Sequence, residues 1–217
     1  MKRIKHWARD ILAPAAVLLL FSAIGALLLS GTHQATAPAI EQAERAIKNQ
    51  LLAQTLPPGH FDNDLSRAIY PLPADPRLGL KRPASHYRAT LNGQISGVIL
   101  EASAPDGYSG EIRLLIGILP DGRVAGVRVT AHRETPGLGD YIEIARSPWI
   151  RQFDGTSLAR PDATHWKVRK DGGPFDYVTG ATVTPRAIVK AVHGALTYFA
   201  AHRAELLSPA LLSGDAP

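Results

Sequence analysis

The sequence predicts an α+β protein, with a single N-terminal transmembrane helix followed by a domain in which helices pack on an antiparallel sheet. Residues 11–30 form a run of twenty residues without a charged side chain. Apolar and polar residues alternate on either side of a Pro-Asp-Gly turn at 120–122, and an apolar stripe at helical spacing follows Pro185. Strands followed along the chain by a helix are typical of the α+β class.

The uncharged run Ile11–Ser30 reads ILAPAAVLLLFSAIGALLLS. As a helix it spans about 30 Å, the thickness of the hydrocarbon core of a bilayer. A cleaved signal peptide is the alternative, because Ala35-Thr36-Ala37 resembles a small-residue cleavage site. The run is longer than the ~7–15 apolar residues of a signal, and Pro38 directly follows that site, so a retained anchor is favoured.

The basic residues flank this run on one side only. Four of them lie in residues 1–10, and none follows the run until Arg45. The positive-inside rule therefore predicts a cytoplasmic flank at 1–10 and a single-pass protein of the cytoplasmic (inner) membrane, with an extracytoplasmic, periplasmic domain. Four basic residues and Asp10 give this flank a charge of +3, out of a net charge of +5 for the chain. The excess of positive charge therefore belongs mainly to the flank and not to a basic face that would suggest nucleic-acid binding.

Composition limits the chemistry. The chain has no cysteine, which excludes a disulfide framework and cysteine-ligated iron–sulfur or zinc sites. Its eight histidines lack the short spacing that places two metal ligands on one helix face, so no metal site is predicted. If the protein carries electrons, we expect an organic carrier.

Residues 31–90 are predicted to connect the anchor to the domain. Pro38–Thr55 has helical periodicity, with Thr36 as a candidate cap and Pro38 in the first turn. Pro57–Arg88 is rich in proline and turn signals, and we expect irregular structure with short strands there.

Residues 91–207 are predicted to form the domain, followed by a C-terminal tail at 208–217. Ile112–Ile118 and Val124–Thr130 are predicted to form a hairpin. The polar side of the first strand is weak, so this strand is expected to be covered on both faces. Gln94–Glu101 adds another strand.

Three further elements complete the expected domain. A short helix is predicted at Tyr141–Phe153 and an edge strand at Trp166–Arg169. The closing helix is predicted to be capped by Thr184 with Pro185 in its first position, and to bury the stripe Ile188, Val192, Leu196 and Phe199.

The segment Asp176–Thr184 carries the most specific signal. It places the hydroxyls of Thr179 and Thr182, with Gly180 between them, just before a helix N-terminus. Unpaired N–H groups and a partial positive charge at such an end suit a phosphate. The plainer alternative is a turn followed by a helix cap, and Thr179 can serve either purpose.

A second segment, His132–Asp140, leaves the end of the predicted hairpin. It contains a proline and two glycines, which let the backbone approach a ligand, and Leu138 can cover the face of an aromatic ring. Loops of this composition on rigid strands are typical of ligand sites.

Four segments in order carry a resemblance to a known family. They are Gly107-Tyr108-Ser109-Gly110, His132 to Gly139 (HRETPGLG), Lys170-Asp171-Gly172-Gly173 and Asp176 to Thr182 (DYVTGAT). With the N-terminal anchor, they resemble the FMN-binding G subunit of Rnf-type ion-translocating electron-transport complexes. The C subunit of the sodium-translocating NADH:quinone oxidoreductase is a longer relative.

The resemblance implies that FMN is joined through its phosphate to the hydroxyl of Thr182. A flavin transferase that uses FAD and Mg²⁺ makes this ester in the family, and the motif that it reads matches Asp176, Thr179, Gly180 and Ala181. Pro185 replaces a serine that is frequent in relatives, and it is compatible with a helix start.

The loop is then expected to position the flavin ring through Glu134, Thr135, Gly137 and Leu138. Glu134 either tunes the ring by hydrogen bonding or orders its own loop. Lys170 either neutralises the phosphate or is a solvated surface residue.

The resemblance implies an electron-transfer subunit of a membrane-bound complex that links ferredoxin and NAD to ion movement, with the other subunits as partners. Such a chain is a redox subunit and not a complete enzyme alone. The alternative function is a membrane-anchored, extracytoplasmic, non-redox binding or adaptor module of the same fold, which would carry no covalent flavin.

Overall fold

The structure is a computed structural model that describes residues 2–208, with the side chains of residues 2–13 and Arg45 left out. The chain divides into two compact units, Met1–Ile47 and Lys48–Pro217. The predicted tail at 208–217 lies outside the described residues apart from Ser208, and so do the side chains of the basic flank at 1–10.

Helix α1 runs without a break over Lys2–Thr55, where two helices were predicted. Thr36 does not cap a second helix, because its hydroxyl donates to the carbonyl of Thr32, one turn back, at 2.8 Å. Pro38 lies inside the helix, where it cannot donate an N–H to the preceding turn. Among the described residues, α1 is the one helix long and apolar enough to cross a membrane, as judged by length and composition, which confirms the predicted candidate span.

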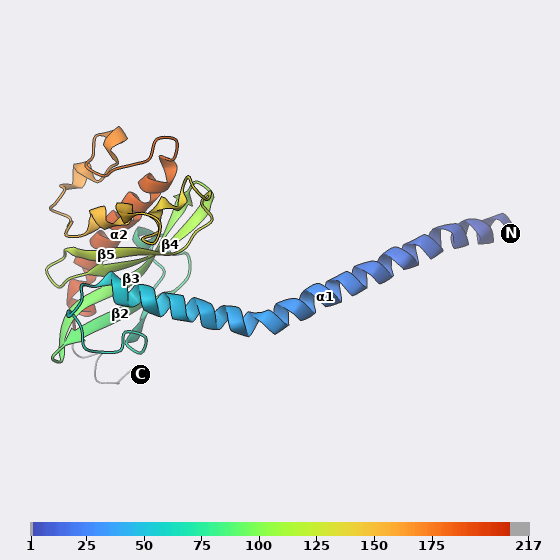
Figure 1. Ribbon diagram of the computed structural model, residues 1–217, viewed down its shortest axis with the longest axis horizontal. Helices are drawn as coiled ribbons and strands as arrows, with labels where there is room; N and C mark the ends of the chain where they lie inside the picture. The colour runs from blue at the N-terminus through green and yellow to red at the C-terminus, as the bar shows by residue number, and fades with distance from the viewer. Residues whose placement is uncertain (1, 209–217) are drawn as a thin grey trace. The chain divides into compact units, whose positions relative to one another are not determined.

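The second unit is built on a five-stranded sheet in the order β1-β2-β3-β4-β5, and the antiparallel sheet predicted from the sequence is confirmed (Figure 1). Each strand pairs with the next one along the chain, so the sheet is a meander. The strands are β1 (Ile69–Leu72), β2 (Ala84–Leu91), β3 (Gln94–Gly107), β4 (Gly110–Ile118) and β5 (Val124–Ala131). The predicted β4–β5 hairpin is confirmed, and β3 extends six residues beyond its predicted end at Glu101.

Helix α2 covers one face of the sheet, and the last turns of α1 with the segment after it cover the other (Figure 1). Leu114 and Ile116 belong to the cluster beneath α2 (Val183–Leu206), whereas Leu115 packs with Leu52 near the end of α1. All three β4 side chains are at most 1% exposed. The prediction that β4 is covered on both faces is confirmed.

The end of α1 lies directly on the sheet because two adjacent strands carry glycine there. Gly117 of β4 pairs with Gly126 of β5. A Cβ atom on either glycine would lie 2.7 Å from the carbonyl oxygen of Thr55, closer than any side chain tolerates. The glycine pair therefore forms a flat seat for the last turn of α1.

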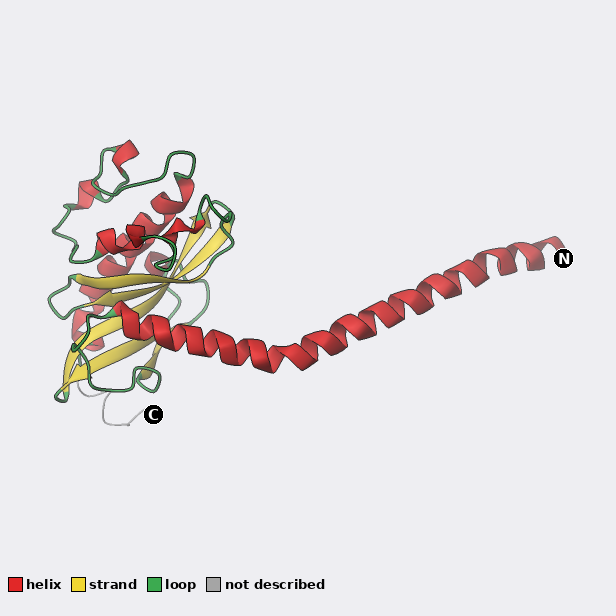
Figure 2. Ribbon diagram, viewed as in Figure 1, coloured by secondary structure: helices red, strands yellow, loops and turns green. Residues whose placement is uncertain are grey.

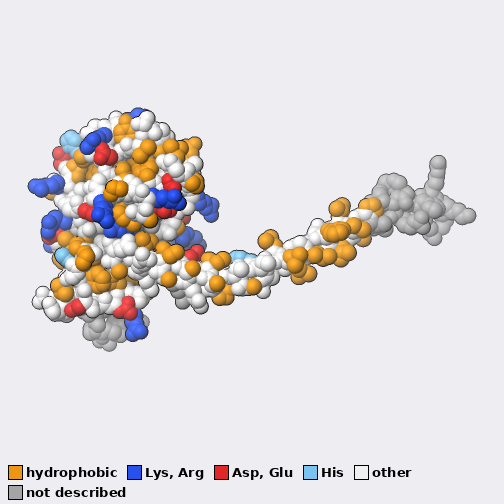
Figure 3. All heavy atoms as spheres, viewed as in Figure 1, with side chains coloured by type: hydrophobic (Ala, Val, Ile, Leu, Met, Phe, Trp, Pro, Cys, Tyr) orange, Lys and Arg blue, Asp and Glu red, His pale blue; other side chains and the backbone are white. Residues whose placement is uncertain are grey.

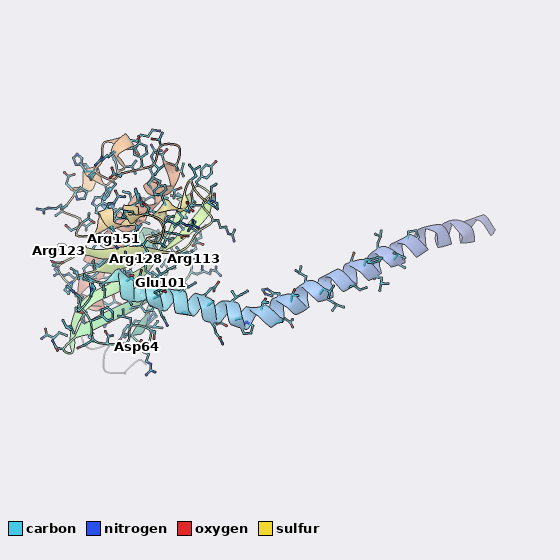
Figure 4. The ribbon with its side chains drawn as sticks, viewed as in Figure 1. Asp64, Glu101, Arg113, Arg123, Arg128 and Arg151 are labelled. Atoms are coloured by element: carbon cyan, nitrogen blue, oxygen red, sulfur yellow. The ribbon has the colours of Figure 1, made fainter. Side chains whose placement is uncertain are left out.

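Two buried arginines bind the C-terminal ends of the two long helices. Arg128 on β5 donates to the carbonyl of Gln54 at 2.7 Å, and Figure 4 labels its side chain beside the end of α1. Arg88 on β2 donates to the carbonyls of Glu205 and Ser208 at 2.9 and 2.7 Å. A positive charge at a helix C-terminus is favoured because the helix dipole is negative there.

Helix α2 begins two residues before the predicted start. Its first residue is Val183 and its N-cap is Thr182, so Thr184 is inside the first turn and not the cap, and Pro185 is the third helical residue. The predicted inward stripe is confirmed, since each of its four residues is at most 2% exposed: Ile188, Val192, Leu196 and Phe199.

The segment between β5 and α2 is mostly loop with short 3₁₀ helices (Figure 2). The helix predicted over Tyr141–Phe153 is wrong: η2 (Asp140–Ile142) and η3 (Pro148–Phe153) stand in its place. Ser147 is extended because it precedes Pro148, which divides the segment.

The edge strand predicted at Trp166–Arg169 is also wrong. Val168 makes only an isolated bridge with Phe175, and the chain around it forms η4 (Ala163–His165) and η5 (Arg169–Asp171). Trp166 is 7% exposed and belongs to the core cluster, as its size and apolar surface favour.

Candidate functional site

Thr182 lies at the junction between the attachment segment, residues 176–182, and helix α2. Its side chain is half-buried and makes no capping hydrogen bond, since its backbone is already helical (φ −86°, ψ −22°). Its carbonyl accepts the N–H of Arg186 at 3.4 Å, the first bond of the helix. The Thr182 hydroxyl is therefore held at the helix end without serving to cap it.

A tight turn presents the residues before Thr182. The N–H of Ala181 donates to the carbonyl of Val178 at 3.0 Å, and Gly180 takes φ +90°, a left-handed conformation that favours glycine. Thr179 and Gly180 are exposed at the tip, and Ala181 is buried.

Side chains from the β5–α2 connection hold both ends of this turn. Asp176 donates its N–H to Gln152 at 2.7 Å and accepts the indole N–H of Trp149 at 2.9 Å through its carbonyl. The Tyr141 hydroxyl donates to the Ala181 carbonyl at 3.3 Å. Burial raises the pKa of Tyr141 to about 12, so this hydroxyl remains a donor at neutral pH.

The loop after β5 is ordered by its own hydrogen bonds. The N–H groups of Leu138 and Gly139 donate to the carbonyl of Thr135 at 3.1 and 2.9 Å, and Gly137, at φ +77°, donates its N–H to Asp140 at 2.8 Å. Thr135, Gly137 and Leu138 are exposed, and the Leu138 side chain keeps 43% of its surface accessible. The loop thus presents one apolar side chain on a fixed backbone.

Glu134 links this loop to the segment around Thr182. Its side chain is buried, at 4% exposure, and one oxygen accepts the N–H of Ser109 in the β3–β4 turn while the other accepts the hydroxyl of Thr184 on α2. Two of the four segments singled out in the sequence therefore meet at one carboxylate, together with the first turn of α2.

The basic residues nearby differ in their partners. Arg169 pairs with Asp176 at 2.9 Å, and Arg186 makes two bonds of 2.6 Å to Asp171, which lower the pKa of that carboxyl. Lys170 is exposed and makes no ion pair with another described side chain. Lys170 can therefore pair with an added phosphate without first breaking an ion pair to a carboxylate.

A hollow of about 390 Å³ opens beside the loop. The end of β5, the loop and the residues just after it line this hollow, namely Val129, Thr130, Ala131, His132, Glu134, Pro136, Asp140, Glu143 and Arg146. No lining residue comes from the attachment segment, so the hollow and Thr182 are distinct features of the same end of the domain.

Comparison with known proteins identifies the two parts of the chain. Residues 107–197 match the FMN-binding domain family, and residues 1–55 match the RnfG N-terminal region. The G subunit of the ion-translocating oxidoreductase complex of Pseudomonas aeruginosa is 51% identical over 206 residues, which cover 95% of this chain and 96% of that protein. The G subunits of Vibrio cholerae and Shewanella baltica are 44% and 43% identical over 190 and 192 residues, or 88% of this chain and 90% and 91% of theirs.

The chain belongs to this family of G subunits. The resemblance inferred from the four segments is thereby confirmed, and so is an FMN-binding domain in the α+β class. The match to the FMN-binding domain contains all four segments, and the match to the RnfG N-terminal region ends at Thr55, the last residue of α1.

Several residues of the site in this G subunit were not predicted as such. Tyr141, Trp149 and Gln152 were not predicted as site residues, and Thr184 was assigned to a cap. Each acts through a contact to a residue far away in the chain, and periodicity carries no signal for such contacts.

Proposed function

We propose that this protein carries FMN as a phosphoester on Thr182 and transfers electrons within an Rnf-type ion-translocating complex. The observation that carries the proposal is the Thr182 hydroxyl, which is uncommitted, half-buried and fixed at the N-terminus of α2 inside an FMN-binding domain.

The surroundings of Thr182 suit a phosphate. Thr184 and Val183 have N–H groups in the first helical turn, where no acceptor within the helix is available, and Pro185 has none to leave unpaired. The helix dipole contributes roughly 0.3–2 kcal/mol to an anion at this end. Lys170 is proposed to add positive charge from the neighbouring turn.

A covalent bond is consistent with these magnitudes. Micromolar retention of a free ligand requires about 8 kcal/mol, several times what the helix end supplies. An ester on Thr182 removes dissociation, so the protein has only to orient the ring. We assign that role to Thr135, Gly137, Leu138 and Glu134 in the loop after β5.

The attachment segment suits recognition by a flavin transferase using FAD and Mg²⁺. Thr179 and Gly180 stand exposed at the tip of the turn, and the Asp176 side chain is 58% exposed beside Arg169. Ala181 is buried, so it fixes the turn against the domain. An enzyme can therefore approach Asp176, Thr179 and Gly180 while the Thr182 hydroxyl stays in place.

From the basic flank at 1–10 we infer an N-terminus in the cytoplasm and an FMN domain on the periplasmic side of the cytoplasmic membrane. The face of the domain in Figure 3 carries both Lys and Arg and Asp and Glu side chains. The other subunits of the complex are the proposed partners.

When bound, the flavin supplies the electron chemistry, accepting and donating electrons one or two at a time. The residues of this chain bind, orient and tune it. The ferredoxin- and NAD-binding steps are assigned to other subunits, because the chain has no glycine fingerprint for a dinucleotide.

The test is the intact mass of the full-length protein made with and without the flavin transferase. We expect a mass increase of one FMN ester, located on Thr182 by peptide mapping and absent from Thr182→Val. Thr179→Ser is the matched control and should keep the flavin. A bare Thr182 in protein from the native host would favour the non-redox adaptor module, and flavin retained by Thr182→Val would refute the site.

A further inference from the structure

The burial of Glu134 is the feature at this site that the proposed function leaves unexplained. It is an acidic side chain buried to 4% exposure, although its loop neighbours Arg133 and Thr135 are exposed. A buried carboxylate is costly unless hydrogen bonds replace its water. The structure provides two, from the N–H of Ser109 at 3.0 Å and from the hydroxyl of Thr184 at 2.5 Å.

These two donors come from separate parts of the fold. Ser109 lies in the turn between β3 and β4, and Thr184 lies on α2, two residues after Thr182 and fifty residues after Glu134. The three residues Glu134, Ser109 and Thr184 are called the Glu134 clasp below. The clasp joins the loop after β5, the β3–β4 turn and the helix that starts at the attachment site.

The neighbours of Glu134 hold its backbone and stem. Its N–H donates to Nδ1 of His132 at 3.0 Å, and Nε2 of His132 lies 2.6 Å from the Glu143 carboxylate. Since Nδ1 accepts a hydrogen bond, we assign the ring proton to Nε2. A Cβ on Gly139 would lie 2.9 Å from Cβ of Glu134 and 3.0 Å from its Oε2, so glycine leaves the space that the acidic side chain fills.

We propose that Glu134 is a positioning residue, whose carboxylate fixes the loop that holds the flavin ring relative to the threonine that carries the flavin phosphate. This inference rests on the proposed function for the cofactor, but the clasp itself is a property of the protein alone. A ring held at one end by an ester and at the other by a loop is ordered only if the loop and Thr182 keep a constant separation. The bond from Glu134 to Thr184 joins the loop to the first turn of α2, two residues after Thr182.

The arms of the clasp can be removed one at a time. Thr184→Val keeps the shape of the side chain and removes only the hydroxyl that reaches Glu134. Glu134→Ala removes both arms. Glu134→Gln keeps the length and can accept from Ser109 while its amide donates to Thr184, and Thr184→Ser keeps the hydroxyl, so both are expected to retain the clasp.

The first measurement is amide hydrogen exchange of the full-length protein in detergent, made without flavin transferase. In Glu134→Ala, the Ser109 amide loses its acceptor and should exchange about ten-fold faster or more. In Thr184→Val the Ser109 arm persists, so exchange there should change little. Unchanged Ser109 exchange in Glu134→Ala would overturn the proposal whether or not the protein carries flavin.

The second measurement is time-resolved fluorescence anisotropy of the same variants made with the transferase. In Thr184→Val and Glu134→Ala, the fraction of the anisotropy decay that comes from fast motion of the flavin ring should increase about two-fold or more. In Thr184→Ser and Glu134→Gln, the ring should still tumble slowly together with the protein. Thr197→Val, a replacement of the same kind further along α2, is the matched control and should not change the decay.

If the flavin ring moves no faster in Thr184→Val and Glu134→Ala than in the unchanged protein, the positioning role is overturned. If Glu134→Ala does not fold, Thr184→Val decides, because it preserves volume. If the unchanged protein carries no flavin after coexpression, the proposed function fails, and Ser109 exchange then decides on the clasp alone.

Discussion

Arg128 of β5 donates a hydrogen bond to the main-chain carbonyl of Gln54, 2.7 Å away, near the last residue of α1. The Arg128 side chain is 8% exposed, so the bond forms away from bulk water, where an unpaired carbonyl would be costly. Beside it, the carbonyl of Thr55 lies above Gly117 and Gly126. The last turn of α1 is thus an integral layer of the domain.

Gly126→Ala should destabilise the domain, because the new Cβ would lie 2.7 Å from the Thr55 carbonyl, a backbone atom that cannot move aside without lifting α1. We expect the free energy of unfolding to fall by about 1–3 kcal/mol. Urea denaturation of the detergent-solubilised protein measures it. Gly31→Ala is the control, since that helical glycine has open space around it; equal stability of both variants would contradict the seat.

Two fragments test the same layer on a larger scale. A fragment from Lys48 to the C-terminus keeps Leu52 and Leu56, which are 1% and 3% exposed in the cluster on the α1 face. A fragment starting at Pro57 loses both, and burial of each leucine is worth about 1.5–3 kcal/mol. The shorter fragment should therefore lose about 3–6 kcal/mol of the roughly 5–15 kcal/mol by which a domain is stable, and it should unfold at a lower urea concentration. Two cooperative transitions at the same urea concentration would refute the role of this layer.

His86 should make the stability of the domain depend on pH. Burial, and secondly the charge of Arg88, lower the pKa of His86 from 6.5 to about 4. Between these values the unfolded chain binds a proton that the folded protein does not, so the free energy of unfolding falls as the pH is lowered from 6.5 towards 4. The loss attributable to His86 reaches about 2 kcal/mol at pH 5.

The measurement is urea denaturation at pH 7 and pH 5 for the unchanged protein and for His86→Phe, which keeps a ring to stack on Tyr70. The difference between the two pH values should be about 2 kcal/mol smaller in the variant. The same replacement at exposed His60 is the control and should leave the difference unchanged. If the loss of unfolding free energy between pH 7 and pH 5 is as large in His86→Phe as in the unchanged protein, groups other than His86 cause the acid sensitivity.

The sequence was most informative where periodicity decides the structure. The stripe Ile188–Phe199 and the alternation in Val124–Thr130 predicted the buried faces of α2 and β5, because helical and strand spacing directly determine which side chains share a face. The helix boundary was less certain, since Pro185 fits the first or the third helical position equally well.

Contacts between distant segments could not be predicted in this way. Gly117 and Gly126 are visible in the sequence, but nothing there indicates that the Thr55 carbonyl lies on them. The bond between Glu134 and Thr184 likewise depends on how a loop and a helix meet across the completed sheet. The candidate site was therefore predicted as four segments, and the way in which they meet required the structure.

Gly137 and Gly139, in the loop after β5, should respond to substitution for different physical reasons. Gly137 has open space around it but takes φ +77°, so Gly137→Ala should cost about 1–2 kcal/mol of unfolding free energy from backbone strain, and Gly137→Asn should recover part of it. Gly139 has an ordinary φ of −109°, but its Cβ would collide with Glu134, so Gly139→Ala and Gly139→Asn should both be destabilising, by about 1–3 kcal/mol. Urea denaturation of the four variants measures the difference. If asparagine were tolerated better than alanine at Gly139, backbone conformation rather than the space taken by Glu134 would explain the glycine.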